Sequence, residues 1–385
     1  MTLPDQRGVA LPVAMAVLAV ILVLSLAFLA LSKSEPVIAA NQQLSSQARA
    51  LAESGVERAI WALTNSGVTG GLSAPSAGAT AGSPYNGDTL ITAGSGGFLL
   101  TVTGVSASEV SIQSVGWAPT NDSSDPRTKA HRKVTATLTK FPTPGNFPCV
   151  VCINGSSEVE GTASVDARTD TTCGSKKGIG VYGTGASLSF DDSGSVYGAD
   201  GNNTANQSTD YVAGSQTDFN GFDPATAQIN SLKAYARSQG TYYQGSRTYN
   251  SSNKLPSGGV IFVDTVSGDN PTASTASSDL ASVEIHGGAA PTGGFNGWII
   301  VNGNVQSSGN YGDLKGFIYA AGTLNAKGSG SSYFEGVMVS KRVLGGSSEI
   351  GGNADLRMNC TAANGNGNIP TGWQLSAGSY REVAD

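Results

Sequence analysis

The sequence is poor in charged residues, and this scarcity narrows the classes of protein to which it can belong. Only 13% of its 385 residues are charged, roughly half the usual share. Its 52 glycines, together with abundant Ser, Thr and Asn, argue against a helical bundle and against an ordinary α/β enzyme. The composition therefore predicts a turn-rich, mostly β protein.

Clusters of basic residues are also lacking. The formal net charge is −6 and the pI is near 5.0, so the chain offers no basic face to a phosphate backbone. We therefore predict no nucleic-acid partner.

Residue types that carry catalysis or bind metals are sparse. His131 lies in a charged hairpin segment and His286 lies near a Gly-Gly turn, without the paired ligand spacing of a zinc site. Asp166, Asp170 and Asp191-Asp192 are the carboxylates that could act as acid–base or calcium groups, but acidic residues in turns are normally solvated. We expect no catalytic residue, no cofactor and no metal ion.

A long apolar segment near the N-terminus predicts a membrane span. Residues 9–31 carry no charge over 23 positions, which as a helix would extend about 34 Å, enough to cross a bilayer. An eight-residue polar leader precedes the segment, unlike the order of parts in an ordinary secretory signal. Arg7 favours a cytoplasmic leader, so we expect a single span with the remainder of the chain exported.

The apolar span continues as an amphipathic helix to about Thr64. Pro36 lacks a backbone N–H and is predicted to kink or locally open this helix, which ends at Asn65-Ser66-Gly67. The apolar and small residues that recur at three- and four-residue steps are Leu44, Ala48, Leu51, Gly55, Ala59 and Ala62 or Leu63. The sequence predicts a helix of roughly 55 residues, half in lipid and half against a soluble domain.

These N-terminal residues resemble those of a known family. The leader end Arg7-Gly8, the uncharged run 9–13 and the segment 50–59 are similar to PilX-type minor pilins and GspK-like minor pseudopilins of type IV filaments. The resemblance covers about residues 1–66. It implies that a prepilin peptidase cleaves after Gly8 and that the new N-terminus, Val9, is methylated.

The resemblance also implies that the helix packs against other pilins, after residence in inner-membrane lipid. Most pilins carry a glutamate at the fifth residue after the cleavage site, where this sequence has Val13. GspK-like subunits share this absence and lie at the filament tip. The residues expected to take part in assembly are Pro12, Val13, Pro36, Leu44, Leu51, Glu53 and Gly55.

The four cysteines all follow the apolar span and would be exported with it. They are Cys149, Cys152, Cys173 and Cys360, and an oxidising compartment favours at least one disulfide among them. Three connectivities are open. Cys149-Val-Val-Cys152 has redox-motif spacing, but its apolar β-like surroundings favour a structural role.

The region after the helix predicts a small antiparallel sheet followed by a domain boundary. Residues 67–97 are Gly- and Ser-rich and are interpreted as a linker. Strands are predicted at 98–103, 110–117 and 133–140 by alternating apolar and polar residues. Prolines at 142, 144 and 148 interrupt regular structure, so residues 67–148 form one predicted region.

An internal repeat predicts a parallel β-solenoid over residues 149–360. Apolar runs begin at Gly297, Gly316 and Gly336, 19 and 20 residues apart, and Gly259 precedes Gly297 by 38 residues, twice 19. Each coil of a solenoid buries its inward side chains by stacking on the next. The residues expected to lie in successive layers are Ile299, Val301, Ile318 and Val337 or Val339. This region resembles the solenoid-like heads of some PilX-type proteins.

An insertion at about 199–256 is predicted to interrupt the solenoid. It contains one helix with Asp223 as N-cap, Pro224 at the first position and Gly240 at the end. The helix face that is expected to be buried contains Ile229, Leu232 and Ala236. The flanking aromatic residues Phe219, Phe222, Tyr242 and Tyr243 are expected to dock on the solenoid, with a contact patch as the alternative. Residues 361–385 are interpreted as a C-terminal tail.

Together these features predict a minor pilin or pseudopilin that primes or caps a type IV pilus or a related secretion filament. The chain would cross the inner membrane once, with a cytoplasmic N-terminus and a periplasmic head, and then lie at a filament tip or the cell surface. Its partners would be other pilins or pseudopilins, the prepilin peptidase, inner-membrane lipid and a surface ligand of the head. The alternatives are a membrane-anchored adhesin outside any filament and a glycan-active β-solenoid enzyme.

Overall fold

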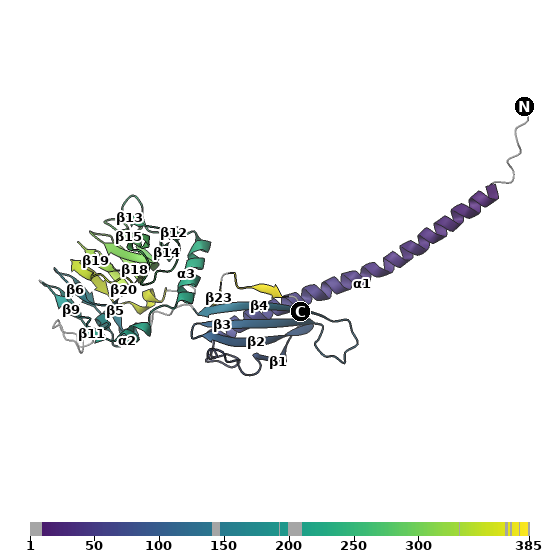
Figure 1. Cartoon of the computed structure of the whole chain (residues 1–385), viewed down its shortest axis with the longest axis horizontal. Helices are drawn as coiled ribbons and strands as arrows, with labels where there is room; N and C mark the ends of the chain where they lie inside the picture. Colours follow the sequence, from purple (N-terminus) through teal and green to yellow (C-terminus); the bar gives the residue numbers. More distant parts are fainter. Residues whose placement is uncertain are drawn as a thin grey trace, which may run out of the picture. The chain divides into compact units, whose positions relative to one another are not determined.

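The chain is mostly β with one long N-terminal helix and forms two compact units (Figure 1). The computed structural model describes residues 10–140, 147–191, 193–198, 210–330, 332–365, 369, 372–376 and 378–383. The first unit comprises Met1–Leu138 and Gly378–Asp385, and the second comprises Thr139–Ala377. The second unit is therefore inserted into the chain of the first. The prediction that residues 361–385 are a tail is wrong for the segment that returns to the first unit.

Helix α1 (Ala10–Thr64) is a single helix of 55 residues, drawn in Figure 1 as a gently curved rod. It ends at the predicted residue. Pro36 lies inside it, and every residue of α1 is described as helical on either side of the proline. The helix therefore continues through Pro36 without the local opening that was one of the two expectations, and the kink stays a prediction.

The first unit contains an antiparallel sheet that covers the C-terminal half of α1. Its strands are β1 (Asn86–Ala93), β2 (Gly96–Ser106), β3 (Glu109–Ala118), β4 (Ala130–Lys140) and β24 (Arg381–Val383). They pair in the order β1-β2-β3-β4, and β24 pairs antiparallel with β4. The three predicted strands are confirmed, whereas β1 lies in the predicted linker. Alternate residues of β2 and β3 are buried, as expected of a sheet with one face on a core.

The second unit is built mainly from two parallel sheets. The first contains β5 (Cys149–Asn154), β7 (Ser164–Asp166), β8 (Lys177–Tyr182), β10 (Ser195–Tyr197), β11 (Tyr211–Gly214), β12 (Tyr242–Gln244), β14 (Gly258–Asp264), β16 (Phe295–Val301), β18 (Asp313–Ala320), β20 (Tyr333–Ser340) and β22 (Asp355–Arg357). The second contains β6 (Ser157–Val159), β9 (Leu188–Phe190), β13 (Arg247–Tyr249), β15 (Ala281–Ile285), β17 (Gly303–Ser307), β19 (Leu324–Gly328) and β21 (Ser348–Gly352). The remaining elements are α2 (Gln216–Asn220), α3 (Thr226–Gln239), α4 (Cys360–Ala363) and β23 (Trp373–Leu375), with two 3-10 helices at Thr171–Cys173 and Ser277–Asp279.

Residues of the predicted repeat stack in register. Gly297 pairs with Gly316, and Gly316 pairs with Gly336. A Cβ on Gly316 would lie 1.8 Å from the carbonyl oxygen of Gly297, so each glycine permits the close approach of the strand below it. The predicted parallel stacking of these runs is confirmed.

Ile299 and Val301, Ile318, and Val337 and Val339 lie in three successive strands of one parallel sheet, as predicted. Within the row of Ile299 and Ile318, the next residue is Met338. The predicted period before Gly297 is wrong. Gly259 pairs directly with Gly297, so the 38 residues between them form one enlarged layer instead of two. Val301 is followed in its row by Ala320.

The layers do not follow the order of the chain. A layer here means a strand of the first sheet with the strand of the second sheet that follows it. The N-terminal part of β20 pairs with β22, and its C-terminal part pairs with β5. Strand β21 likewise pairs with β6. Strand β22 and strand β5 therefore both lie beside β20, end to end, although they are far apart in the chain. On their other side, β22 pairs with β7 and β5 pairs with β8.

The predicted insertion at 199–256 is smaller than expected, because β11, β12 and β13 join the parallel sheets. Helix α3 ends before Gly240, which has the left-handed conformation, and the predicted apolar face is buried. Its N-cap is Ala225 and not Asp223. The side chain of Asp223 is instead 11% exposed, and its carboxylate pairs with Lys341 at 2.6 Å.

The aromatic residues near α2 and α3 pack within the second unit, as expected. Phe219 is fully buried, and its ring lies 5.1 Å from that of Phe222. The ring of Tyr242 stacks on Phe262. These rings cover the parallel sheets.

Candidate functional site

The N-terminal part of α1 is an unburied apolar rod. The segment from Leu11 to Phe28 is long and apolar enough to cross a membrane, judged by length and composition, and none of it is buried. Val13 is 54% exposed, and Pro12 beside it is also exposed. This segment fits a membrane anchor. The predicted processing residues Gly8 and Val9 lie outside the described residues.

The C-terminal part of α1 packs on the antiparallel sheet through small residues. Gly55 faces β3, where a Cβ would lie 2.0 Å from the hydroxyl oxygen of Ser114. A Cβ on Gly116 of β3 would lie 2.0 Å from the carbonyl oxygen of Ala48. Leu44 and Leu51 are half-buried on the same part of the helix. The small residues let the helix and strand backbones approach closely, which explains the predicted small and apolar face.

Glu53 belongs to a polar contact between α1 and the C-terminal segment. Its carboxylate accepts hydrogen bonds from the Tyr380 hydroxyl at 2.9 Å and from Arg49 Nε at 3.1 Å. The hydrogen bond from Tyr380, followed by that from Arg49, lowers the pKa of Glu53 below its usual value. Glu382 lies 3.8 Å from Arg49 and 3.6 Å from Arg132. The predicted assembly residue Glu53 thus attaches β24 to the helix, a contact that a reading of residues 361–385 as a tail missed.

The four cysteines form two disulfides in the structure. Cys149 is bonded to Cys152 within β5, where both are fully buried. Cys173 is bonded to Cys360, 187 residues away. This second disulfide joins the 3-10 helix Thr171–Cys173 to the start of α4. Asp170 lies within 4.8 Å of both of these sulfurs, but both sulfurs belong to the disulfide and neither is a free thiolate ligand.

The other candidate residues for chemistry have structural partners. His131 stacks on Trp117 with ring centroids 4.7 Å apart. His286 hydrogen bonds to Ser308 and Glu284. The carboxylate of Asp166 pairs with Arg168 at 2.8 Å. Asp192 lies outside the described residues.

Asp170 accepts hydrogen bonds from the Thr172 hydroxyl and, at 2.9 Å, from the Cys360 amide. Asp191 is exposed. Among the described residues, the structure does not bring the predicted aspartates and histidines together into one cluster.

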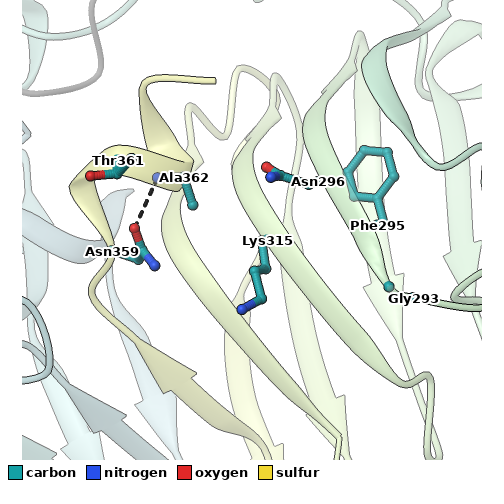
Figure 2. A pocket seen from close by; sticks show the side chains of 8 residues that line it. Gly293, Phe295, Asn296, Lys315, Asn359, Thr361 and Ala362 are labelled. Atoms are coloured by element: carbon teal, nitrogen blue, oxygen red, sulfur yellow. Dashed lines mark hydrogen bonds between the residues drawn. The ribbon is translucent and has the colours of Figure 1, made fainter. Parts of the chain in front are cut away.

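A pocket of about 340 Å³ lies in the second unit beside α4 (Figure 2). Its walls come from the turn before β16, from β18 and from the segment around α4. The lining residues are Gly293, Gly294, Phe295, Asn296, Lys315, Asn359, Thr361 and Ala362. A second pocket of about 380 Å³ is lined by residues that include Lys176, Tyr182, Val212 and Phe222. No repeat in the sequence indicates either pocket, because each combines segments far apart in the chain.

Comparison with protein-family models found no match, and no curated protein matched the chain. Among solved structures, the chain is similar to a competence-associated pilin, ComZ, from Thermus thermophilus. The sequence identity is 12%, the TM-score is 0.25, and the likeness covers 89% of this chain and 97% of that chain.

Proposed function

We propose that this chain is a minor pilin or pseudopilin that primes or caps a type IV pilus or a related secretion filament. The observation that carries the proposal is α1, a single helix whose first part is an unburied apolar rod and whose last part packs on an antiparallel sheet.

The exposed apolar side chains of the first part of α1 are expected to be removed from water by lipid or by other protein. Transfer of one Leu, Ile, Val or Phe side chain from water to an apolar environment stabilises it by about 1.5–3 kcal/mol, and this segment exposes a run of such side chains. The 18 residues from Leu11 to Phe28 would extend about 27 Å, close to the hydrocarbon thickness of a bilayer. Lipid of the inner membrane supplies the cover before assembly, and the helices of neighbouring pilins supply it in the filament.

The continuity of α1 supports the filament subunit over the passive anchor in this proposal. A passive anchor needs only a span, whereas α1 runs without interruption from the apolar segment into the part that packs on β2 and β3. Because the rise per residue of an α-helix is constant, a continuous helix holds the domain that follows at a set distance from the helices that pack on its apolar segment. In this proposal, a prepilin peptidase cleaves after Gly8, and the leader is on the cytoplasmic side.

We place the subunit at the filament tip or in the priming complex. Val13 lacks the carboxylate that the resemblance assigns to the fifth residue of repeating pilins. A tip subunit has neighbours only below it, so it does not need a charge pair with a subunit above. The bulk of a second unit from Thr139 to Ala377 also favours a position that is not repeated at close spacing.

The second unit is proposed to be a β-solenoid head that is displayed by the filament and serves adhesion. The support is the in-register parallel pairing of successive glycine-led strands in one sheet and of the strands that follow them in the other. No catalytic role is included in the proposal. The described carboxylates Asp166 and Asp170 are both engaged by partners of their own.

Processing is tested by mass spectrometry of the full chain, recovered from membranes of cells with and without a prepilin peptidase. With the peptidase, we expect loss of residues 1–8 and a methylated Val9. Gly8→Val should block cleavage. Gly82→Ala is the matched control because a Cβ on Gly82 meets no atom within 4 Å. An intact leader in the presence of the peptidase would mean that the chain is a non-assembling anchor.

The tip position is tested by immunogold labelling of sheared filaments with antibody against the second unit. We expect gold at filament ends or in basal complexes, and Val13→Glu should leave that pattern unchanged or reduce assembly. Even labelling along the shaft would exclude the tip position. Label that stays in the membrane of cells that make filaments would exclude assembly altogether.

A further inference from the structure

Three buried side chains of the second unit meet around one carboxylate. They are Lys233 of α3, Asp264 at the end of β14, and Asn302, which directly follows β16. Lys233 is 8% exposed, Asn302 is 1% exposed and Asp264 is fully buried. Val263 and Val301 pair in register, so the residues that follow them, Asp264 and Asn302, lie side by side in neighbouring strands. A lysine, a carboxylate and an amide are thus enclosed together.

Asp264 contacts the other two side chains, one through each oxygen atom. Its Oδ2 atom lies 2.7 Å from Lys233 Nζ, and its Oδ1 atom accepts a hydrogen bond of 2.7 Å from Asn302 Nδ2. Asn302 Nδ2 also donates to Asn270 Oδ1 at 3.0 Å, so two acceptors specify which end of the amide faces the carboxylate. Asp264 is therefore placed to take protons from the amine and to give protons to the amide nitrogen.

Neighbouring groups hold the carboxylate and the amine in this position. The Tyr242 hydroxyl donates to Asp264 Oδ2 at 2.9 Å, and the Thr265 amide donates to Oδ1 at 3.0 Å. Lys233 Nζ also donates to the carbonyl oxygen of Gly268 at 2.9 Å. Groups that are held together in a fixed geometry react far faster than the same groups free in solution. Burial also excludes the water that would otherwise compete for the protons.

We propose that Lys233 and Asn302 form an intramolecular isopeptide bond. Asp264 takes a proton from Lys233 Nζ, the free amine attacks Cγ of Asn302, and the Cγ–Nδ2 bond breaks as the Nζ–Cγ bond forms. Two protons pass from Nζ to Nδ2 by way of Asp264, which ends ionised as it began. The leaving group is ammonium, which carries away the charge of the lysine, and nothing is oxidised or reduced.

The structure shows the three side chains before this reaction, so a freshly folded chain carries the ion pair between Lys233 and Asp264. The isopeptide bond then replaces this pair with a covalent link between α3 and the end of β16. The bond forms within the second unit, whether or not the chain enters a filament. The mass measurement below can therefore fail while the processing and labelling tests succeed, and the reverse.

A second lysine, carboxylate and amide provide an internal comparison. Lys315 Nζ lies 2.9 Å from Glu335 Oε2, and Asn359 Nδ2 donates to the same atom at 3.3 Å. The side chains of Lys315 and Glu335 are 38% and 20% exposed, so water reaches this group. Both nitrogen atoms also share one oxygen of the carboxylate. We expect no bond between Lys315 and Asn359, because neither the exclusion of water nor the two-sided contact is present.

The test is mass spectrometry of the full chain, purified in detergent and incubated until its mass is constant. We expect a loss of about 17 Da relative to the unreacted chain, the mass of one ammonia. Peptide mapping should then find Lys233 joined to Asn302. An unchanged mass would overturn the proposal. A loss of about 18 Da, with Lys233 joined to Asp264, would overturn it too, because the carboxylate would then be the group attacked.

Variants show that the loss comes from the lysine. Lys233→Arg keeps a positive charge beside Asp264 but cannot form the bond, and Asp264→Asn removes the group that transfers the protons. Neither variant should lose ammonia, and circular dichroism checks that each is folded. Asn359→Ala is the matched control and should lose ammonia as the wild type does. A loss of ammonia that persists in Lys233→Arg would refute the proposal, because a succinimide at Asn302-Gly303 also releases ammonia but joins no lysine.

Discussion

A buried ion pair provides a sharp test of how α3 is held in the second unit. Lys233 of α3 is 8% exposed, and its Nζ lies 2.7 Å from Oδ2 of the fully buried Asp264 in β14. The same carboxylate accepts hydrogen bonds from Asn302 Nδ2 at 2.7 Å, the Thr265 amide at 3.0 Å and the Tyr242 hydroxyl at 2.9 Å. Asp264 is thus fully coordinated, and Lys233 is the positive charge that pairs with it.

The perturbation is Lys233→Met, which keeps the apolar stem and removes the charge. It leaves Asp264 buried with three neutral donors and no counter-charge, and breaking a buried pair from one side costs about 3–5 kcal/mol. For a domain of this size, each kcal/mol lowers the midpoint of thermal unfolding by about 2–4 °C. The midpoint of the second unit should therefore fall by about 6–20 °C.

The double variant Lys233→Met with Asp264→Asn should recover most of this loss. Its neutral amide accepts from Asn302 and the Thr265 amide, and it presents an NH₂ group to the Tyr242 hydroxyl, which can rotate to accept. We expect a remaining cost of about 1–2 kcal/mol. Lys327→Met is the control, because Lys327 is 41% exposed in its pairs with Glu160 and Glu349 and should lose less than about 1 kcal/mol.

The assay combines thermal unfolding by circular dichroism with hydrogen exchange measured on peptides from α3 and β14. Exchange reports these elements separately from the first unit, so a drop in midpoint can be assigned to them. A single variant within about 1 kcal/mol of wild type, or a double variant no more stable than the single one, would refute the reasoning.

Three further predictions concern other contacts. Gly55→Ala should destabilise the first unit by about 1–3 kcal/mol through the clash with Ser114, and adding Ser114→Gly should restore stability in chemical denaturation. Tyr380→Phe removes the main cause of the lowered pKa of Glu53, so NMR titration should show that pKa rising toward 4.5, with faster hydrogen exchange in β24. Hydrogen bonds from the Thr172 hydroxyl and then from the Cys360 amide lower the pKa of Asp170 below 3.8. The ionised Asp170 therefore contributes fully to the free energy of unfolding above about pH 4, and this contribution is lost as the pH falls through the lowered pKa. Asp170→Asn removes the titrating group and should flatten this part of the acid-unfolding curve.

The local elements could be predicted from sequence because their patterns are strong. The apolar run and the steps of three and four residues specify α1 to its last residue, and the glycines at 297, 316 and 336 specify strands that stack in register. The cap of α3 was predicted wrongly. Asp223 has the residue type of an N-cap, but burial beside Lys341 and Tyr319 uses its carboxylate elsewhere.

The order of the layers could not be predicted, because every layer presents the same short apolar strand to its neighbours. No feature of the local sequence indicates that β5 lies end to end with β22 beside β20, or that β6 pairs with β21. The pocket beside α4 escaped prediction for a related reason. Asn296 and Asn359 look like ordinary turn and surface residues in sequence, and only the fold places them around one pocket.

The order of strands along the chain has a consequence for synthesis, because some strands are translated long before the strands with which they pair. Residues of β5 and β6 leave the ribosome before their neighbours β20 and β21 exist, although Val151 and Met338 are paired at a distance of about 190 residues in the chain. Until then the edges of these strands that face β20 and β21 carry unpaired backbone N–H and C=O groups, which can pair with other chains and cause aggregation. Pairings between strands so far apart in the chain also form slowly. The last strand to be made, β24, completes the sheet that the first strands began. A chain stopped before β20 is therefore expected to leave both sheets of the second unit and the edge of β4 exposed at once, so that only full-length product escapes aggregation and proteolysis.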